Sequence, residues 1–301
     1  MQLNLYVNTI SNHLKERFGE RVRKLTVDGS FSCPNRDGSI GRGGCTFCNM
    51  DSFVKPEQHL LPVADQLALR KQELKHSNIK YLAYFQAYSS TYGEIQHLKK
   101  MYQQALQEPD IVGICVGTRP DCLSDEVLAL LADYQEQGKE VWLELGLQTA
   151  HDHTLRRINR GHDFTCYQQA VAKAKSYNIN ICCHLILGLP GEGTAEYRKT
   201  LAQVLETGVQ GLKLHPLHIV EGSAMARTWR AGRLRIMAEE EYTQAAVDII
   251  QHTPKDIIYH RVTAKGRPPV LLAPDWCGDR WSSMVAISKK LAGTGSQGSK
   301  C

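Results

Sequence analysis

Residues 33–48 read Cys33-Pro-Asn-Arg-Asp-Gly-Ser-Ile-Gly-Arg-Gly-Gly-Cys-Thr-Phe-Cys48 and place three cysteines in one loop, with the spacing C-x11-C-x2-C. The last two cysteines are close enough in sequence to hold the same metal centre. Thiolates are soft ligands that suit zinc or an iron–sulfur cluster. Glycines 38, 41, 43 and 44 let the backbone wrap closely around a bound group. The loop therefore predicts a metal site.

Three thiols leave the identity of that metal open. A structural zinc site is normally closed by a fourth protein ligand, for which His59 is a candidate. A cluster held by three cysteines instead leaves one iron open for a small molecule. The spacing alone does not separate these two alternatives, so the rest of the chain must do so.

Composition sets broad limits on the protein. The chain has 301 residues, is 42% hydrophobic and has a net charge of +5 with a pI near 8.6, which allows a nucleic-acid substrate without requiring one. Ten cysteines would suit a disulfide-linked secreted protein, but the length, the absence of a signal peptide and the clustering of only three of them favour a reducing cytoplasm. No apolar run approaches the roughly 20 residues of a spanning helix, so we expect no membrane association.

Short apolar runs alternate with helical patterns along the first 220 residues. They predict strands over 22–27, 80–85, 111–116, 140–145, 179–187 and 211–214. Helices are expected over 3–18, 60–75, 93–106, 125–136, 166–176 and 195–206. This alternation indicates a parallel α/β fold, and strands buried on both faces suit a barrel or an open doubly wound sheet.

The chain divides into four segments by this pattern. Residues 1–20 form an N-terminal helix, and 21–220 form the α/β unit. Residues 221–292 form a smaller extension, with helices over 238–252 and 282–291 and a strand-like run over 257–262. The tail 293–301 is rich in Gly, Ser and Lys and is expected to be disordered.

Polar or glycine-rich residues follow five of the predicted strands, and the cysteine loop follows the first. In a parallel barrel these strand ends converge on one face, where active sites lie. The metal site would then share a mouth with all the other strand ends. This arrangement favours an enzyme over a zinc knuckle.

Taken together, these stretches resemble a radical SAM enzyme, and more closely the YhcC-type subgroup, which is related to the radical SAM module of the Elongator catalytic subunit. The resemblance implies a partial (β/α)6 radical SAM barrel with a small mixed C-terminal extension. The first gap in the cysteine loop is longer than the usual C-x3-C-x2-C, as it is in Elongator-type proteins. The stretches that carry the resemblance are Cys33…Cys45-Thr-Phe-Cys48, Thr118-Arg-Pro-Asp121, Gly146-Leu-Gln148, Asn159-Arg-Gly-His162 and Gly188-Leu-Pro-Gly191.

By this resemblance Cys33, Cys45 and Cys48 hold a [4Fe–4S] cluster whose fourth iron binds S-adenosylmethionine. Reductive cleavage of that cofactor would yield a 5′-deoxyadenosyl radical for hydrogen abstraction from substrate. Such chemistry needs a closed, dry cavity, which a barrel mouth supplies. It also implies an electron donor such as flavodoxin or ferredoxin.

Six residues are candidate contacts of that cofactor. Gln148 and Arg160 match the family positions that contact its ribose and carboxylate, although Arg160 in a surface ion pair is the alternative. Gln86 and Tyr88 stand where the superfamily has Gly-Gly-Glu, so their loop would offer backbone groups to the methionine amine. Glu144 shares strand parity with Gln148 and therefore faces the lumen, either toward the cofactor or in a structural ion pair.

The sixth candidate, His184, either positions the adenosine or packs in the barrel wall. The resemblance favours a tRNA nucleoside as substrate, with a small metabolite as the second choice. A non-catalytic iron–sulfur or zinc-binding regulatory protein is the alternative from another class. Arg227, Arg230, Arg233 and Arg235 flank Trp229, as in an RNA-binding surface or a solvated helix face. The sequence does not determine the oligomeric state.

Overall fold

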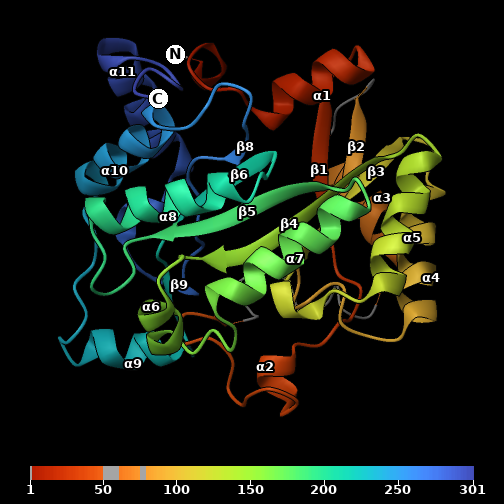
Figure 1. Ribbon diagram of the computed structural model, residues 1–301, viewed down its shortest axis with the longest axis horizontal. Helices are drawn as coiled ribbons and strands as arrows, with labels where there is room; N and C mark the ends of the chain where they lie inside the picture. Colours follow the sequence, from red (N-terminus) through yellow and green to blue (C-terminus); the bar gives the residue numbers. More distant parts are fainter. Residues whose placement is uncertain (1, 50–60, 75–78) are drawn as a thin grey trace.

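Seven parallel strands form one curled sheet in the computed structural model, which describes residues 2–49, 61–74 and 79–301 (Figure 1). The two edge strands come together, because Nζ of Lys24 on β1 lies 2.9 Å from Nδ1 of His260 on β8. The sheet is therefore a half-barrel around a lumen. Its strands, in spatial order, are β1 (Val22–Val27), β2 (Lys80–Phe85), β3 (Ile111–Thr118), β4 (Glu140–Gln148), β5 (Asn180–Leu187), β6 (Gly211–Pro216) and β8 (Ile258–Arg261).

Helices cover the convex face of the sheet, and the main hydrophobic core lies between the two layers (Figure 1). Most strands are apolar on both faces, as parallel strands covered by helices require. The connecting helices are α3 (Val63–Leu74), α4 (Ile95–Leu106), α5 (Asp125–Glu136), α6 (Asp152–Arg157), α7 (Phe164–Ser176) and α8 (Thr194–Glu206). The parallel α/β half-barrel predicted from the sequence is therefore confirmed, although Leu60 and Lys75 of one expected helix lie outside the described residues.

The sheet has one strand more than the six that the sequence predicted for the barrel. The strand-like run assigned to the C-terminal extension is β8, which pairs in parallel with β6 and completes the curl. The pairing contains a bulge, because Leu212 pairs with Tyr259 whereas Lys213 pairs with Arg261. A bulge redirects side chains, and this one lets both His260 and Arg261 reach the lumen.

The N-terminal helix begins later than the apolar stripe predicted. Residues 3–18 contain a short 3-10 helix, η1 (Leu3–Leu5), and then α1 (Ile10–Phe18). Between them Thr9 forms a parallel bridge with Tyr259 of β8, and its hydroxyl accepts a hydrogen bond from the amide of Asn12. The helix is interrupted because these residues pair with the outer edge of β8. Without this pairing, the backbone N–H and C=O groups along that edge would lack partners.

Helix α1 closes the floor of the half-barrel, at the end opposite to α2 (Pro34–Asp37) (Figure 1). Ile10 and Leu14 pack against Trp142 inside the lumen. Beside them the fully buried carboxylate of Glu140 lies 2.6 Å from the guanidinium of Arg17. Among the described residues, α1 thus closes the lumen at the amino ends of the strands, and the cavity opens at their carboxyl ends.

The C-terminal segment packs on the half-barrel and also supplies part of its mouth. It contains a two-stranded antiparallel ribbon of β7 (Ile219–Val220) and β9 (Leu271–Ala273). Its helices are α9 (Ala224–Arg230), α10 (Glu239–Gln251) and α11 (Arg280–Thr294). Both chain termini lie beside α11 (Figure 1).

The tail over 293–301 is anchored to the rest of the fold through one buried residue, in contrast to the disorder expected from its composition. The side chain of Gln297 is 3% exposed and donates hydrogen bonds to the carbonyls of Pro254 and Ile257. Its Oε1 accepts a hydrogen bond from the amide of Asn8. Composition predicted disorder because the tail lacks apolar residues, whereas one buried amide side chain here replaces them as the anchor.

Candidate functional site

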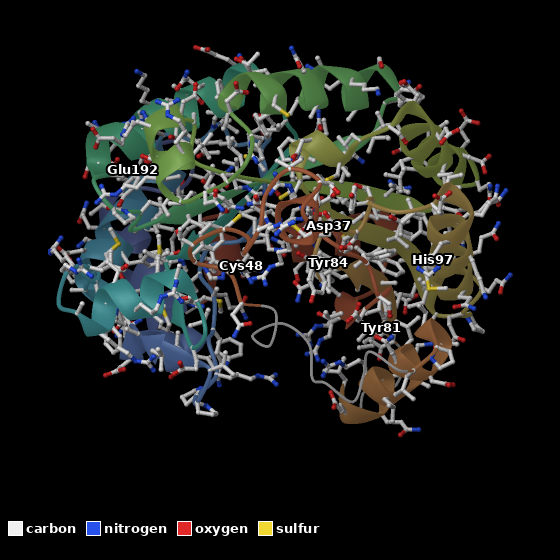
Figure 2. The ribbon with its side chains drawn as sticks, turned by 90° about the horizontal axis from the view of Figure 1, so that it is seen from below. Asp37, Cys48, Tyr81, Tyr84, His97 and Glu192 are labelled. Atoms are coloured by element: carbon white, nitrogen blue, oxygen red, sulfur yellow. The ribbon has the colours of Figure 1, made fainter. Side chains whose placement is uncertain are left out.

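A cavity of about 620 Å³ opens at the carboxyl ends of the strands. Figure 2 views the molecule from this end, with Cys48 and Tyr84 near the middle and His97 and Glu192 toward the edges. All nine residues that the sequence predicted for cluster and cofactor line this one cavity: Cys33, Cys45, Cys48, Gln86, Tyr88, Glu144, Gln148, Arg160 and His184. The cavity is therefore the candidate active site.

The cysteine loop folds around a short helix and several glycines. Cys33 precedes α2, and its carbonyl accepts hydrogen bonds from the amides of Arg36 and Asp37. Gly44 has φ +77°, and a Cβ there would lie 2.7 Å from Nε of Arg36. That close approach lets Arg36 donate to the carbonyl of Cys48 at 2.9 Å. Glycine is thus required for the loop to close on itself.

The three loop thiols line the cavity but are not all as close together as the ligands of one zinc ion would be. Ligand sulfurs around one tetrahedral zinc ion lie roughly 3.8 Å apart. Among the described residues, the one set of three potential ligands within 4.8 Å of one another is Glu144, Cys182 and His184, and the loop cysteines form no such set. A cubane cluster binds each cysteine through a different iron and holds the sulfurs further apart. The proposed fourth zinc ligand, His59, lies outside the described residues.

Arg160 lies beside the cysteine loop and is 7% exposed. Its Nη1 donates to Sγ of Cys45 at 3.4 Å, and its Nε donates to the carbonyl of Gly146 at 3.1 Å. Among the described residues no carboxylate pairs with it, which argues against the surface ion pair. Gly146 makes this approach feasible, because a Cβ there would lie 2.8 Å from the guanidinium.

Two of the cofactor candidates have a left-handed backbone. Gln148 has φ +82° at a register shift at the end of β4, and Tyr88 has φ +60° in the loop after β2. Residues other than glycine adopt this conformation at a cost, and such strain concentrates at functional sites. Both side chains line the cavity. The strained backbone at these two positions is consistent with a functional role for the side chains that it holds at the cavity.

Glu144 is the centre of a buried charge network inside the lumen. Its Oε1 accepts from Nζ of Lys24 at 2.5 Å and lies 2.7 Å from Nδ1 of His260. Its Oε2 accepts from Nζ of Lys213 at 2.7 Å and lies 2.7 Å from Nε2 of His184. The carboxylate is fully buried, and its pKa is well below the usual range because the lysine charges outweigh the cost of burial. This is the ion-pair alternative left open by the sequence.

Lys24, Lys213, His260 and Arg261 are lumen residues that the sequence analysis did not identify. Lys213 carried a usable signal, because a lysine in the middle of the apolar strand over 211–214 has to find a buried partner. The two lysines at Glu144 disfavour a metal ion between Glu144, Cys182 and His184, because they add positive charge and occupy both carboxylate oxygens. His184 is therefore a network member whose pKa is lowered to about 4 by burial and by Lys213.

The basic run around Trp229 is partly neutralised. Arg230 donates to the carboxylate of Glu221 at 3.0 Å, and Arg235 donates to Glu241. This pairing favours a solvated helix face over an RNA-binding surface.

Across the described part of the chain, no helix combines the length and apolar character needed to cross a bilayer.

Two family models match the chain. The model described as "Radical SAM superfamily" matches residues 37–204, and the "Radical_SAM C-terminal domain" matches residues 209–292. The first match begins just after Cys33 and includes Cys45 and Cys48. The chain therefore belongs to the radical SAM superfamily, whose members are enzymes that cleave S-adenosylmethionine.

Within that superfamily the chain is similar to the YhcC proteins. Protein YhcC of Escherichia coli K12 is 57% identical over 99% of this chain and 96% of its own length. A tRNA uridine(34) acetyltransferase of Dehalococcoides mccartyi is 26% identical in an alignment that covers 56% of this chain and 36% of that relative. Among solved structures, an archaeal Elp3 from Methanocaldococcus infernus has a TM-score of 0.68 at 17% identity, covering 92% of this chain and 64% of that one, which supports the fold.

Proposed function

We propose that Cys33, Cys45 and Cys48 hold a [4Fe–4S] cluster and that the residues around them bind S-adenosylmethionine above a substrate in the lumen. The observation that carries this proposal is the convergence of all nine predicted residues on one cavity, with Arg160 in contact with Cys45. The donor set fits the cluster, since three soft ligands face the cavity from a single glycine-rich loop. When bound and reduced, the cluster supplies the electron that cleaves the sulfonium of S-adenosylmethionine.

The chain's own residues bind, orient and exclude water. The guanidinium of Arg160 is anchored at Gly146 and is directed toward Cys45, so it is well placed for the cofactor carboxylate. Gln148 offers its amide to the ribose, and the loop containing Gln86 and Tyr88 offers backbone groups to the methionine amine. Helix α1 closes the other end of the lumen, which keeps water away from a radical.

For the substrate, the relatives favour a tRNA nucleoside. This choice rests on the tRNA uridine(34) acetyltransferase, whose similarity extends over 56% of this chain. A small metabolite is the second candidate. Flavodoxin or ferredoxin is proposed as the electron donor. Comparative mass spectrometry of tRNA nucleosides, with and without the protein in the cell, tests the first choice. A nucleoside whose modification depends on the protein supports it, and unchanged tRNA favours the metabolite.

Anaerobic reconstitution tests the cluster. The wild type should bind close to four irons per chain and, with a strong reductant, convert S-adenosylmethionine to 5′-deoxyadenosine. Cys45→Ala should lose both properties. Cys166→Ala is the matched control, because that thiol is half-buried on α7 and does not line the cavity. Wild-type iron content in Cys45→Ala, or stoichiometric zinc with no capacity for iron, contradicts the proposal.

Arg160 tests cofactor binding separately from cluster binding. Losing its charge-assisted bond to a carboxylate should weaken S-adenosylmethionine binding by about 10- to 150-fold in Arg160→Ala. Arg160→Lys should recover part of the affinity, since an ammonium does not reproduce the bidentate contact. Iron content should stay near four per chain in both variants. Calorimetric titration of the anaerobic protein measures this, and unchanged affinity in Arg160→Ala would remove the arginine from the site.

A further inference from the structure

The lumen below the proposed cofactor site contains more positive than negative charge. Lys24, Lys213 and Arg261 face one carboxylate, that of Glu144. Among the described residues that line the cavity, Glu144 is also the one acidic residue. Buried charge without a partner is costly, so a protein that retains it must neutralise it in some other way.

The acceptor capacity of Glu144 is already used. Its two oxygens contact both lysines and both lumen histidines. Arg261 is left without an anion, because no carboxylate or other acceptor in the described part of the chain bonds to its guanidinium, and its buried Nε lacks a partner. The histidines do not change the charge balance, since burial and the neighbouring lysines lower the pKa of His184 to about 4 and that of His260 to about 3.

Two further cations stand at the rim of the same cavity. Lys265 and Arg267 follow β8, line the cavity and are exposed. Neither forms an ion pair within the described residues, in contrast to Arg70 and Arg119, which also line the cavity. An incoming anion would therefore pass Lys265 and Arg267 before it reaches Arg261, and a cleft of one sign attracts such ligands.

We propose that the substrate carries an anionic group, a phosphate or a carboxylate, and that Arg261 with Lys213 binds this group in the lumen while Lys265 and Arg267 guide its entry. The inference rests on the proposed function, because it assigns the space below the cofactor to substrate. S-adenosylmethionine does not satisfy these residues, because its single carboxylate is assigned to Arg160 and its sulfonium adds positive charge. A planar guanidinium with free donors suits either anion through two parallel hydrogen bonds.

The test uses the anaerobic, cluster-loaded chain with saturating S-adenosylmethionine, so that the cofactor site is filled. Inorganic phosphate and succinate are titrated separately by calorimetry at constant ionic strength, which distinguishes the two anionic groups. The wild type should bind at least one of them, and Arg261→Gln should weaken that binding by about 10- to 150-fold. Arg261→Lys should recover part of it. Arg233→Gln, an exposed arginine outside the cavity, is the matched control and should bind as the wild type does.

A second variant protects the test against misfolding of Arg261→Gln. Lys265→Gln/Arg267→Gln changes exposed residues alone, and it should weaken anion binding several-fold with an unchanged thermal midpoint. The inference is overturned if the wild type binds neither anion, if saturating S-adenosylmethionine abolishes the binding, or if these variants bind like the control. Cleavage of S-adenosylmethionine is measured on the same samples. Cleavage without anion binding refutes this inference and leaves the proposed function standing. Absence of cleavage counts against the proposed function, and any anion binding then shows only that the lumen holds an anion site.

Discussion

Replacing Glu144 with glutamine should destabilise the protein strongly. The fully buried carboxylate is the counter-ion of two lysines and accepts or shares four hydrogen bonds at 2.5–2.7 Å. A glutamine amide keeps one acceptor oxygen and turns an NH2 group toward cationic donors. Removing one partner of a buried ion pair typically costs about 3–5 kcal/mol. We expect the free energy of unfolding of Glu144→Gln to fall by about that amount at pH 7.

The deficit should depend on pH in a defined direction. Burial lowers the pKa of Lys213 to about 8 against an ordinary value of 10.5, and loss of Glu144 lowers it further. Between the folded and ordinary values the unfolded chain binds more protons, so stability rises with pH in that window. In Glu144→Gln the pKa of folded Lys213 is lower still, so the pH range over which stability rises is wider than in the wild type. The difference in unfolding free energy between the variant and the wild type should therefore shrink by about 1 kcal/mol from pH 7 to pH 9.

Anaerobic urea unfolding followed by tryptophan fluorescence measures both effects, since Trp142 packs against His260 in the lumen. Glu240→Gln is the matched control, because it makes the same change in an exposed ion pair with Lys290 and should alter stability little. A deficit below about 1 kcal/mol in Glu144→Gln, or one that does not vary with pH, would refute the assignment of Glu144 as the buried counter-ion.

Four further results are expected. Gln148→Gly should relieve the left-handed backbone strain and raise the free energy of unfolding by up to about 1 kcal/mol, and a lower free energy of unfolding would argue against strain. The same change should weaken S-adenosylmethionine binding, measured by calorimetry, by about 2- to 12-fold. Leu14→Ala on the lumen floor should cost about 2–5 kcal/mol in urea unfolding, and a near-zero cost would mean that α1 does not close the barrel. Amide hydrogen exchange at residues 295–299 should be slow in the wild type and faster in Gln297→Ala. Fast exchange in the wild type would instead support the disorder that the composition predicted. The pKa of His184 is about 4 in the folded protein, compared with an ordinary value of 6.5, so between pH 4 and pH 6.5 the unfolded chain binds more protons than the folded one. The free energy of unfolding should therefore fall by about 2–3 kcal/mol from pH 6.5 to pH 4, and by less in His184→Gln.

Much of this protein was predictable because the signals were local. Apolar runs bounded by glycine and polar residues marked the strands to within a few residues, and the order of strands and helices implied a parallel sheet. The rule that parallel strand ends meet on one face then brought the cysteine loop, Gln148 and Arg160 to a single cavity. Each step depended on residues near one another in sequence or on a general rule of topology.

The tertiary structure alone decided the charge balance of the lumen and the closure of its floor. Glu144 meets partners from β1, β5, β6 and β8, and Trp142 meets α1, across separations along the chain that no periodicity encodes. The bulge between β6 and β8 brings Arg261 into the cavity, although strict alternation with His260 would have sent it outward. Sheet curl and strand register determine which charges share a buried space. Both are set by packing of the whole chain, so the sequence specified the cluster loop but only the fold revealed what lies beneath it.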